Sequence, residues 1–207
     1  MCVKCMMGGF HDESIQTDKP KTNQQTIELS DGLLDRRWKN YMHHVGQLDD
    51  GDIDFYVDPK MSKVHKRFTK RLIKRINKLT ETDIIINHNK SEADVVVETR
   101  DSYKDMGYEG AAGLAFWKGD KQYATWLTEY NNRTIKNKRG RRNPTKWVQK
   151  LITHEVLHTL GLDHPMGQGY NPDYNNEDSA MSYNMSNYGL STALRPADVM
   201  ALQTLWG

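Results

Sequence analysis

The sequence has few of the features that would cross-link its fold or place it in a membrane. It has only two cysteines, Cys2 and Cys5, which lie too close together to staple a domain. No apolar run approaches the roughly 20 residues that a membrane-spanning helix needs, and the N-terminus lacks the apolar stretch of a secretory signal. We therefore expect synthesis in the cytoplasm, no membrane partner, and either release by an unconventional route or incorporation into a particle.

An excess of charge of one sign is also missing. The chain has 29 Lys and Arg against 27 Asp and Glu, a net charge of +2, so we expect no nucleic-acid partner. Two local basic runs stand out at 63–79 and 136–142, and neither is interleaved with aromatic residues for base stacking. We interpret them as a solvated helix face and an exposed loop; the alternative is a surface for an anionic partner or an acidic substrate.

Repeats are absent as well, including the calcium-binding nonapeptide repeats of β-rolls, so the sequence does not indicate calcium. Residues 1–25 are polar and aperiodic, and we predict a flexible N-terminal arm there. The rest of the 207-residue chain, from residue 26 to 207, is long enough for one domain with a proper core.

The hydrophobic pattern of that domain predicts an α+β (mixed α/β) fold. Residues 61–80 predict an amphipathic helix, with one apolar stripe of Val64, Phe68, Leu72, Ile76 and Leu79. Short runs rich in β-branched and aromatic residues predict strands at 53–58, 83–87 and 93–99. Two further runs, 113–117 and 123–127, predict a hairpin. A short helix is predicted at 195–207.

A further helix is predicted at 143–161 from the signals at both of its ends. Asn143 is a suitable N-cap, Pro144 fits the first helical position, and Gly161 suits a left-handed C-terminal stop. Apolar residues leave this helix little polar face, so it should lie in the middle of the domain.

This central helix carries the sequence HEVLHTLGLDH at 154–164. His154 and His158 are one turn apart on the same face, so both imidazoles can reach one cation at about 2.0–2.1 Å. Gly161 lets the chain turn and bring His164 back as a third ligand. Three imidazole ligands favour one catalytic zinc ion and leave a position open for water. Glu155, about 100° round the helix, can act there as general base and then acid.

At this point the sequence resembles the metzincin metallopeptidases, whose H-E-x-x-H-x-x-G-x-x-H motif is followed by a methionine turn. SAMSY at 179–183 matches that turn, and its Met-Ser-Tyr looks most like the serralysins and less closely like the astacins. GLDHP at 161–165 and the ending LRPADVMALQTLWG also look like a serralysin catalytic domain. The resemblance covers about residues 50–207, without the β-roll of serralysins.

The resemblance implies a zinc-dependent endopeptidase that hydrolyses a protein or peptide substrate through a Glu155-activated, zinc-bound water. It implies that Met181 packs beneath the zinc ligands and that Tyr183 is an additional ligand or an oxyanion stabiliser. It also implies an upper subdomain to about residue 161, with a twisted, mostly parallel sheet and helices packed above the zinc cleft. A small lower subdomain would follow at 162–207, and 113–117 would be the edge strand beside which an extended peptide lies.

Three alternatives stay open. A zinc-stabilised structural or binding module would need the histidines but not Glu155. A hydrolase of cell-wall peptide cross-links would keep the chemistry and change the substrate. Within the protease hypothesis, a thiolate of Cys2 or Cys5 would hold the enzyme latent by occupying the open zinc position; the simpler interpretation is that both cysteines lie on the flexible arm.

Overall fold

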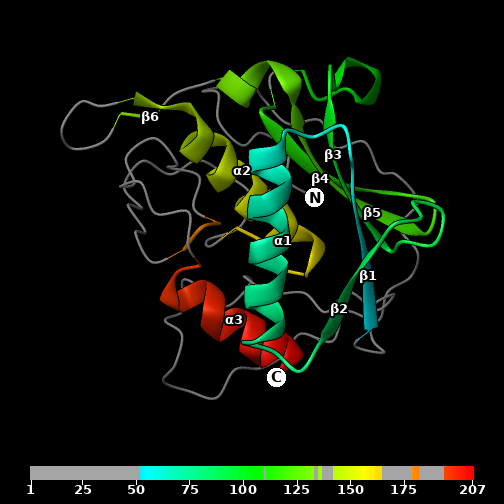
Figure 1. The fold of residues 1–207 in the computed structure, drawn as a ribbon, viewed down its shortest axis with the longest axis vertical. Helices are drawn as coiled ribbons and strands as arrows, with labels where there is room; N and C mark the ends of the chain where they lie inside the picture. The colour runs from blue at the N-terminus through cyan, green and yellow to red at the C-terminus, as the bar shows by residue number, and fades with distance from the viewer. Residues whose placement is uncertain (1–51, 110, 133–134, 137–141, 165–178, 182–193) are drawn as a thin grey trace.

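The computed structural model describes residues 52–109, 111–132, 135–136, 142–164, 179–181 and 194–207 (Figure 1). These residues form a mixed α/β fold in which helices pack on a five-stranded, mostly parallel sheet, so the predicted fold class is confirmed. The predicted arm at 1–25 lies outside the described residues. The division into subdomains at residue 161 stays a prediction.

The sheet has the strand order β2-β1-β3-β5-β4. Four strands run parallel, and β4 pairs antiparallel with β5 at one edge, as predicted for 113–117. Alternate residues, such as Phe55, Val95 and Ala124, point to one face and join the main core. The strands are β1 (Asp52–Val57), β2 (Asp83–Asn87), β3 (Val95–Arg100), β4 (Gly113–Lys118) and β5 (Lys121–Leu127).

Helix α1 (Lys63–Asn77) lies on this core face, and Ser62 caps it by accepting a hydrogen bond from the His65 backbone N–H at 3.2 Å. The predicted apolar stripe is right from Phe68 onward but wrong at Val64, which is 50% exposed. Val64 sits about 100° from the centre of the buried stripe, and His65 takes the inward position against Trp126. The basic residues face outward, as a solvated face requires.

Helix α2 (Pro144–Thr159) is the central helix of the fold, as its apolar sequence predicts. It packs on β4 and β5 and beside α1 (Figure 1). Its observed bounds lie within two residues of the predicted 143–161. Several of its side chains are fully buried and join the same core as α1: Val148, Leu151, Ile152, Val156 and Leu157.

Helix α3 (Pro196–Trp206) closes the chain and lies near the C-terminal end of α1 (Figure 1). The indole N–H of Trp206 donates to the Leu160 carbonyl at 2.9 Å, and the Trp206 carbonyl accepts from the Glu81 N–H at 2.7 Å. These bonds tie the end of the chain both to the segment after α2 and to the segment after α1.

The remaining described elements are short. They are two 3₁₀ turns, η3 (Lys104–Met106) and η4 (Thr128–Asn132), and a small hairpin of β6 (Ile135–Lys136) and β7 (Arg142–Asn143) that the sequence did not predict. A second apolar cluster, built on Tyr103, Ala111, Leu114 and Leu127, covers the other face of the sheet at its β4–β5 edge. No helix in the described ranges is long and apolar enough to cross a membrane.

Candidate metal centre

Three histidines converge at the C-terminal end of α2. His154, His158 and His164 each offer a ring nitrogen, and these nitrogens lie within 4.8 Å of one another. The Nε2 atoms of His154 and His164 are 3.0 Å apart. Two nitrogens bound to one tetrahedral ion at about 2.0–2.1 Å would be about 3.3 Å apart, so the cluster needs little change to hold a metal ion.

His154 is oriented by a backbone carbonyl from a distant part of the chain. Its Nδ1 lies 2.9 Å from the carbonyl oxygen of Ala180. Because a carbonyl oxygen only accepts, Nδ1 must carry the proton, and the Nε2 lone pair of the neutral ring then faces the other histidines. This is the arrangement in which outer hydrogen bonds usually orient a metal-binding histidine.

His158 is oriented by the turn that ends its own helix. Gly161 has a left-handed φ of 92°; the Leu162 N–H donates to Leu157 and the Gly161 N–H to His158, which is a Schellman motif. This turn places the Leu162 carbonyl 2.7 Å from Nδ1 of His158. The Nε2 of His158 is buried and has no hydrogen-bond partner among the described residues. Gly161 therefore acts as predicted, and its turn also fixes the His158 tautomer.

The same turn delivers His164, whose side chain is fully buried. The backbone N–H of His164 donates to Oδ1 of Asp163 at 2.7 Å, which holds the chain at this point. The ring centroids of the three histidines are 4.7 to 4.9 Å apart. The sequence prediction that these three side chains come together is therefore met by the geometry.

Burial keeps these histidines neutral in the absence of a metal. It lowers the pKa of His154 to about 4, against opposing effects of the hydrogen bond to Ala180 and the charge of Asp163. Burial also holds the pKa of His158 and of His164 well below the usual value, with repulsion between neighbouring histidines adding to the effect. Neutral imidazoles are the form that binds metal, so the site does not have to lose protons at neutral pH.

Glu155 lies beside the cluster in a different environment. Its side chain is fully buried, and neither carboxylate oxygen has a hydrogen-bond partner among the residues that the structure describes. Burial raises the pKa of Glu155 well above the ordinary value. A buried carboxylate without a partner is costly, and such groups gather at functional sites. Together with Nε2 of His158, these oxygens are the polar atoms that a metal ion and a water molecule would satisfy.

A turn at 179–181 contacts the centre through the Ala180 carbonyl, and Asp198 of α3 holds this turn. Met181 is fully buried in the main core, and the sequence resemblance had placed it near the ligands. Asp198 accepts from Ser179 Oγ at 2.7 Å and from the Ala180 N–H at 2.9 Å. Since the Ala180 carbonyl orients His154, Asp198 supports a candidate metal ligand through the turn. Sequence reasoning missed Asp198; an Asp in the first turn of the closing helix was its only signal.

The other residues with a predicted role cannot be placed. Tyr183, the predicted additional ligand or oxyanion stabiliser, lies outside the described residues, as do Cys2 and Cys5. Their roles stay predictions.

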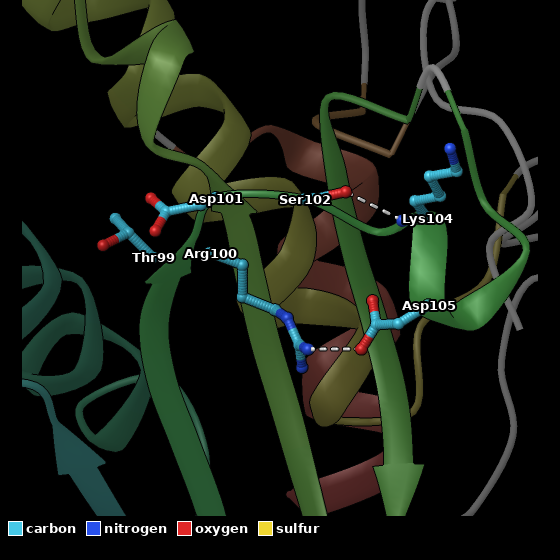
Figure 2. A pocket seen from close by; sticks show the side chains of 6 residues that line it. All are labelled: Thr99, Arg100, Asp101, Ser102, Lys104 and Asp105. Carbon is cyan, nitrogen blue, oxygen red and sulfur yellow. Dashed lines mark hydrogen bonds and ion pairs between the residues drawn. The ribbon is translucent and has the colours of Figure 1, made fainter.

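A separate pocket of about 650 Å³ lies at the carboxyl end of β3 (Figure 2). Arg100 pairs there with Asp105 at 3.2 Å, and Ser102 Oγ accepts from the Lys104 backbone N–H at 3.0 Å. None of the residues that line it belongs to the histidine cluster. Because its arginine is already paired within the pocket, we take the histidine cluster as the candidate functional site.

No protein-family model matches the chain, and a search of curated proteins finds no significant match. The assignment of the site therefore depends on its geometry: three neutral imidazoles able to hold one metal ion, beside a buried carboxylate.

Proposed function

We propose that the chain is a zinc-dependent endopeptidase of the metzincin type. The observation that carries this proposal is the convergence of His154, His158 and His164 beside a fully buried Glu155 that has no hydrogen-bond partner among the described residues. A purely structural metal site has no use for such a carboxylate.

The donor set supports zinc over magnesium or calcium, because all three predicted ligands are imidazoles. Three protein ligands are the number that catalytic zinc sites use, whereas structural sites use four. When bound, zinc would supply Lewis-acid chemistry, polarising the scissile carbonyl and making water acidic enough to attack it at neutral pH.

The protein's own residues would then supply orientation and proton transfer. His154 and His158 keep their Nε2 atoms directed at the centre because backbone carbonyls hold their Nδ1 atoms. Glu155 would take the proton of the attacking water and pass it to the leaving amine; the raised pKa of Glu155 suits a group that must hold that proton for part of the cycle. An extended peptide would lie along the edge strand β4, and Tyr183 would stabilise the oxyanion.

A second candidate is a metal-stabilised structural or binding module. The burial of the centre favours it, since His154, Glu155 and His164 all have exposed fractions of 0%. Under this hypothesis the metal would stabilise the fold and no peptide would be cleaved.

One experiment separates the two candidates. The purified protein is incubated with a peptide library as isolated, after chelation, and after zinc is restored, and the zinc content is measured in parallel. We expect about one zinc per chain, and cleavage that chelation removes and zinc restores. Stoichiometric zinc without any cleavage would support the structural module.

A further inference from the structure

Gly113, the first residue of the edge strand β4, lies directly against Glu155. It pairs with Trp126 of β5, whose side chain is fully buried in the main core, so this position of β4 faces α2. A Cβ atom at residue 113 would lie 2.5 Å from Oε1 of Glu155 and 2.8 Å from Cδ1 of Leu151. Both distances are too short for non-bonded atoms.

The glycine is present because of space and not because of backbone conformation. Gly107, Gly119 and Gly161 have positive φ, whereas Gly113 has an ordinary strand conformation that any residue could adopt. A glycine inside a strand weakens it and often marks a place where another group must approach closely. Here the group that approaches is the carboxylate of Glu155.

The atoms that an added Cβ would meet are the ends of two side chains, Leu151 and Glu155. Leu151 and Glu155 are one turn apart on the same face of α2, and both are fully buried. Glu155 also lacks a hydrogen bond to any described residue that could fix its carboxylate. The carboxylate therefore occupies the space that a side chain at residue 113 would fill.

We infer that Gly113 is a positioning residue for Glu155: the missing side chain on β4 sets the place of the carboxylate relative to the three histidines. This inference rests on the proposed function, because it assigns a purpose to the position of a catalytic carboxylate. A methyl group at residue 113 would displace the Glu155 carboxylate from its place against the strand and would leave the histidine face, about 100° round the helix, less disturbed.

The kinetic test compares Gly113→Ala with wild type and with Gly119→Ala. Gly119 is a matched control: it lies in the β4–β5 turn with φ 66° and has nothing within 4 Å of its added Cβ, so alanine there strains the backbone without approaching Glu155. For Gly113→Ala we expect bound zinc and KM near the wild-type values and kcat lower by about 100-fold, the scale of a misplacement of about 1 Å. Gly119→Ala should keep kcat. Wild-type kcat in Gly113→Ala would overturn the inference.

A thermodynamic test needs no activity. Urea unfolding of the chelated protein is measured for Gly113→Ala in the wild-type, Glu155→Ala and Leu151→Ala backgrounds. We expect alanine at residue 113 to lower the urea midpoint clearly less when Glu155 is alanine, because the nearest clashing atoms are gone. The inference is wrong if the two substitutions are additive, or if only Leu151→Ala relieves the effect.

The same variants also test the inference if Gly113→Ala does not fold. If Gly113→Ala alone is unfolded, Glu155→Ala in the same chain should restore folding, and failure to restore it would overturn the inference. A wild-type protein that binds zinc but cleaves no peptide would refute the proposed function instead, while the urea cycle would still decide whether Gly113 positions Glu155.

Discussion

Two neighbouring faces of α2 hold their polar groups in opposite ways. On one face, His154 and His158 are oriented by hydrogen bonds from Nδ1 to the carbonyls of Ala180 and Leu162. On the other, Glu155 has no such bond to the described residues and is held by packing against β4. A metal ligand must keep one direction, whereas a group that carries a proton back and forth must not be committed to a fixed partner. Under the proposed function, each face therefore suits its own task.

The largest effect should come from removing a ligand on the histidine face. His158→Ala should abolish the rise in unfolding free energy that zinc produces, which reaches about 4 kcal/mol when free zinc is 1,000 times the Kd. Thermal unfolding with zinc and with chelator measures this rise. His88→Ala, at an exposed histidine of the same protein, is the control and should keep the full rise. An equal rise in His158→Ala would mean that zinc binds elsewhere.

The unfolding free energy of the chelated protein should depend on pH through the histidines on one face of α2 and through Glu155 on the other. Below pH 6.5 the unfolded chain binds protons at histidines that stay neutral when folded, so stability should fall as the pH drops from 6.5 to 4. The lowered pKa of His154, about 4, accounts for on the order of 3 kcal/mol of this fall. Glu155 should oppose this trend: burial raises its pKa well above 4.5, so from pH 4.5 upward the folded form keeps a proton that the unfolded chain has lost, and this contribution lowers stability as the pH rises.

Urea unfolding at a series of pH values measures this curve. Glu155→Gln should remove the opposing contribution and make the rise in stability from pH 4.5 to 6.5 steeper. An unchanged slope in Glu155→Gln would contradict the assignment.

The support of the histidine face through α3 can be broken at Asp198. Asp198→Ala removes the acceptor for Ser179 Oγ and for the Ala180 N–H, and should lower the unfolding free energy by roughly 2–3 kcal/mol. Because Ala180 orients His154, zinc affinity should also fall by about 10- to 100-fold. Asp94→Ala is the control. It removes the side chain that accepts a hydrogen bond from the Asp54 N–H in the sheet, so it should lower stability without changing zinc affinity. Equal zinc affinities in both variants would contradict the role of Asp198.

A smaller effect should follow from changing the turn after α2. Gly161→Ala places a side chain at φ 92° and should lower the unfolding free energy by about 1–2 kcal/mol. It should also weaken zinc binding, because the turn places the Leu162 carbonyl on His158. Gly119→Ala carries a similar backbone strain at φ 66° and should leave zinc binding unchanged. Titration with zinc and urea unfolding distinguish the two variants.

Much of the histidine face could be predicted because its signals are local. The spacing of His154 and His158, the stop at Gly161 and the apolar surroundings of α2 are all visible along about 20 residues of sequence. The strands followed from their β-branched runs in the same way. The prediction for Val64 was wrong because it extended the apolar stripe into the first turn of α1, where His65 is the buried residue instead.

The surroundings of Glu155 could not be predicted from local signals. Gly113 meets Glu155 only because the β4–β5 hairpin packs on α2, and Asp198 reaches Ala180 only because α3 packs against the turn at 179–181. Both contacts join residues far apart in the chain, and neither residue type is unusual where it stands. A strand glycine or a helix aspartate has many common explanations, so only the assembled fold shows what each one touches.

The most direct test of the central claim is to measure zinc content and peptide cleavage for wild type and Glu155→Ala side by side. The proposed function predicts about one zinc per chain in both proteins and cleavage by wild type alone, with the loss in Glu155→Ala on the order of 100-fold or more. Equal cleavage rates in the two zinc-loaded proteins would contradict it.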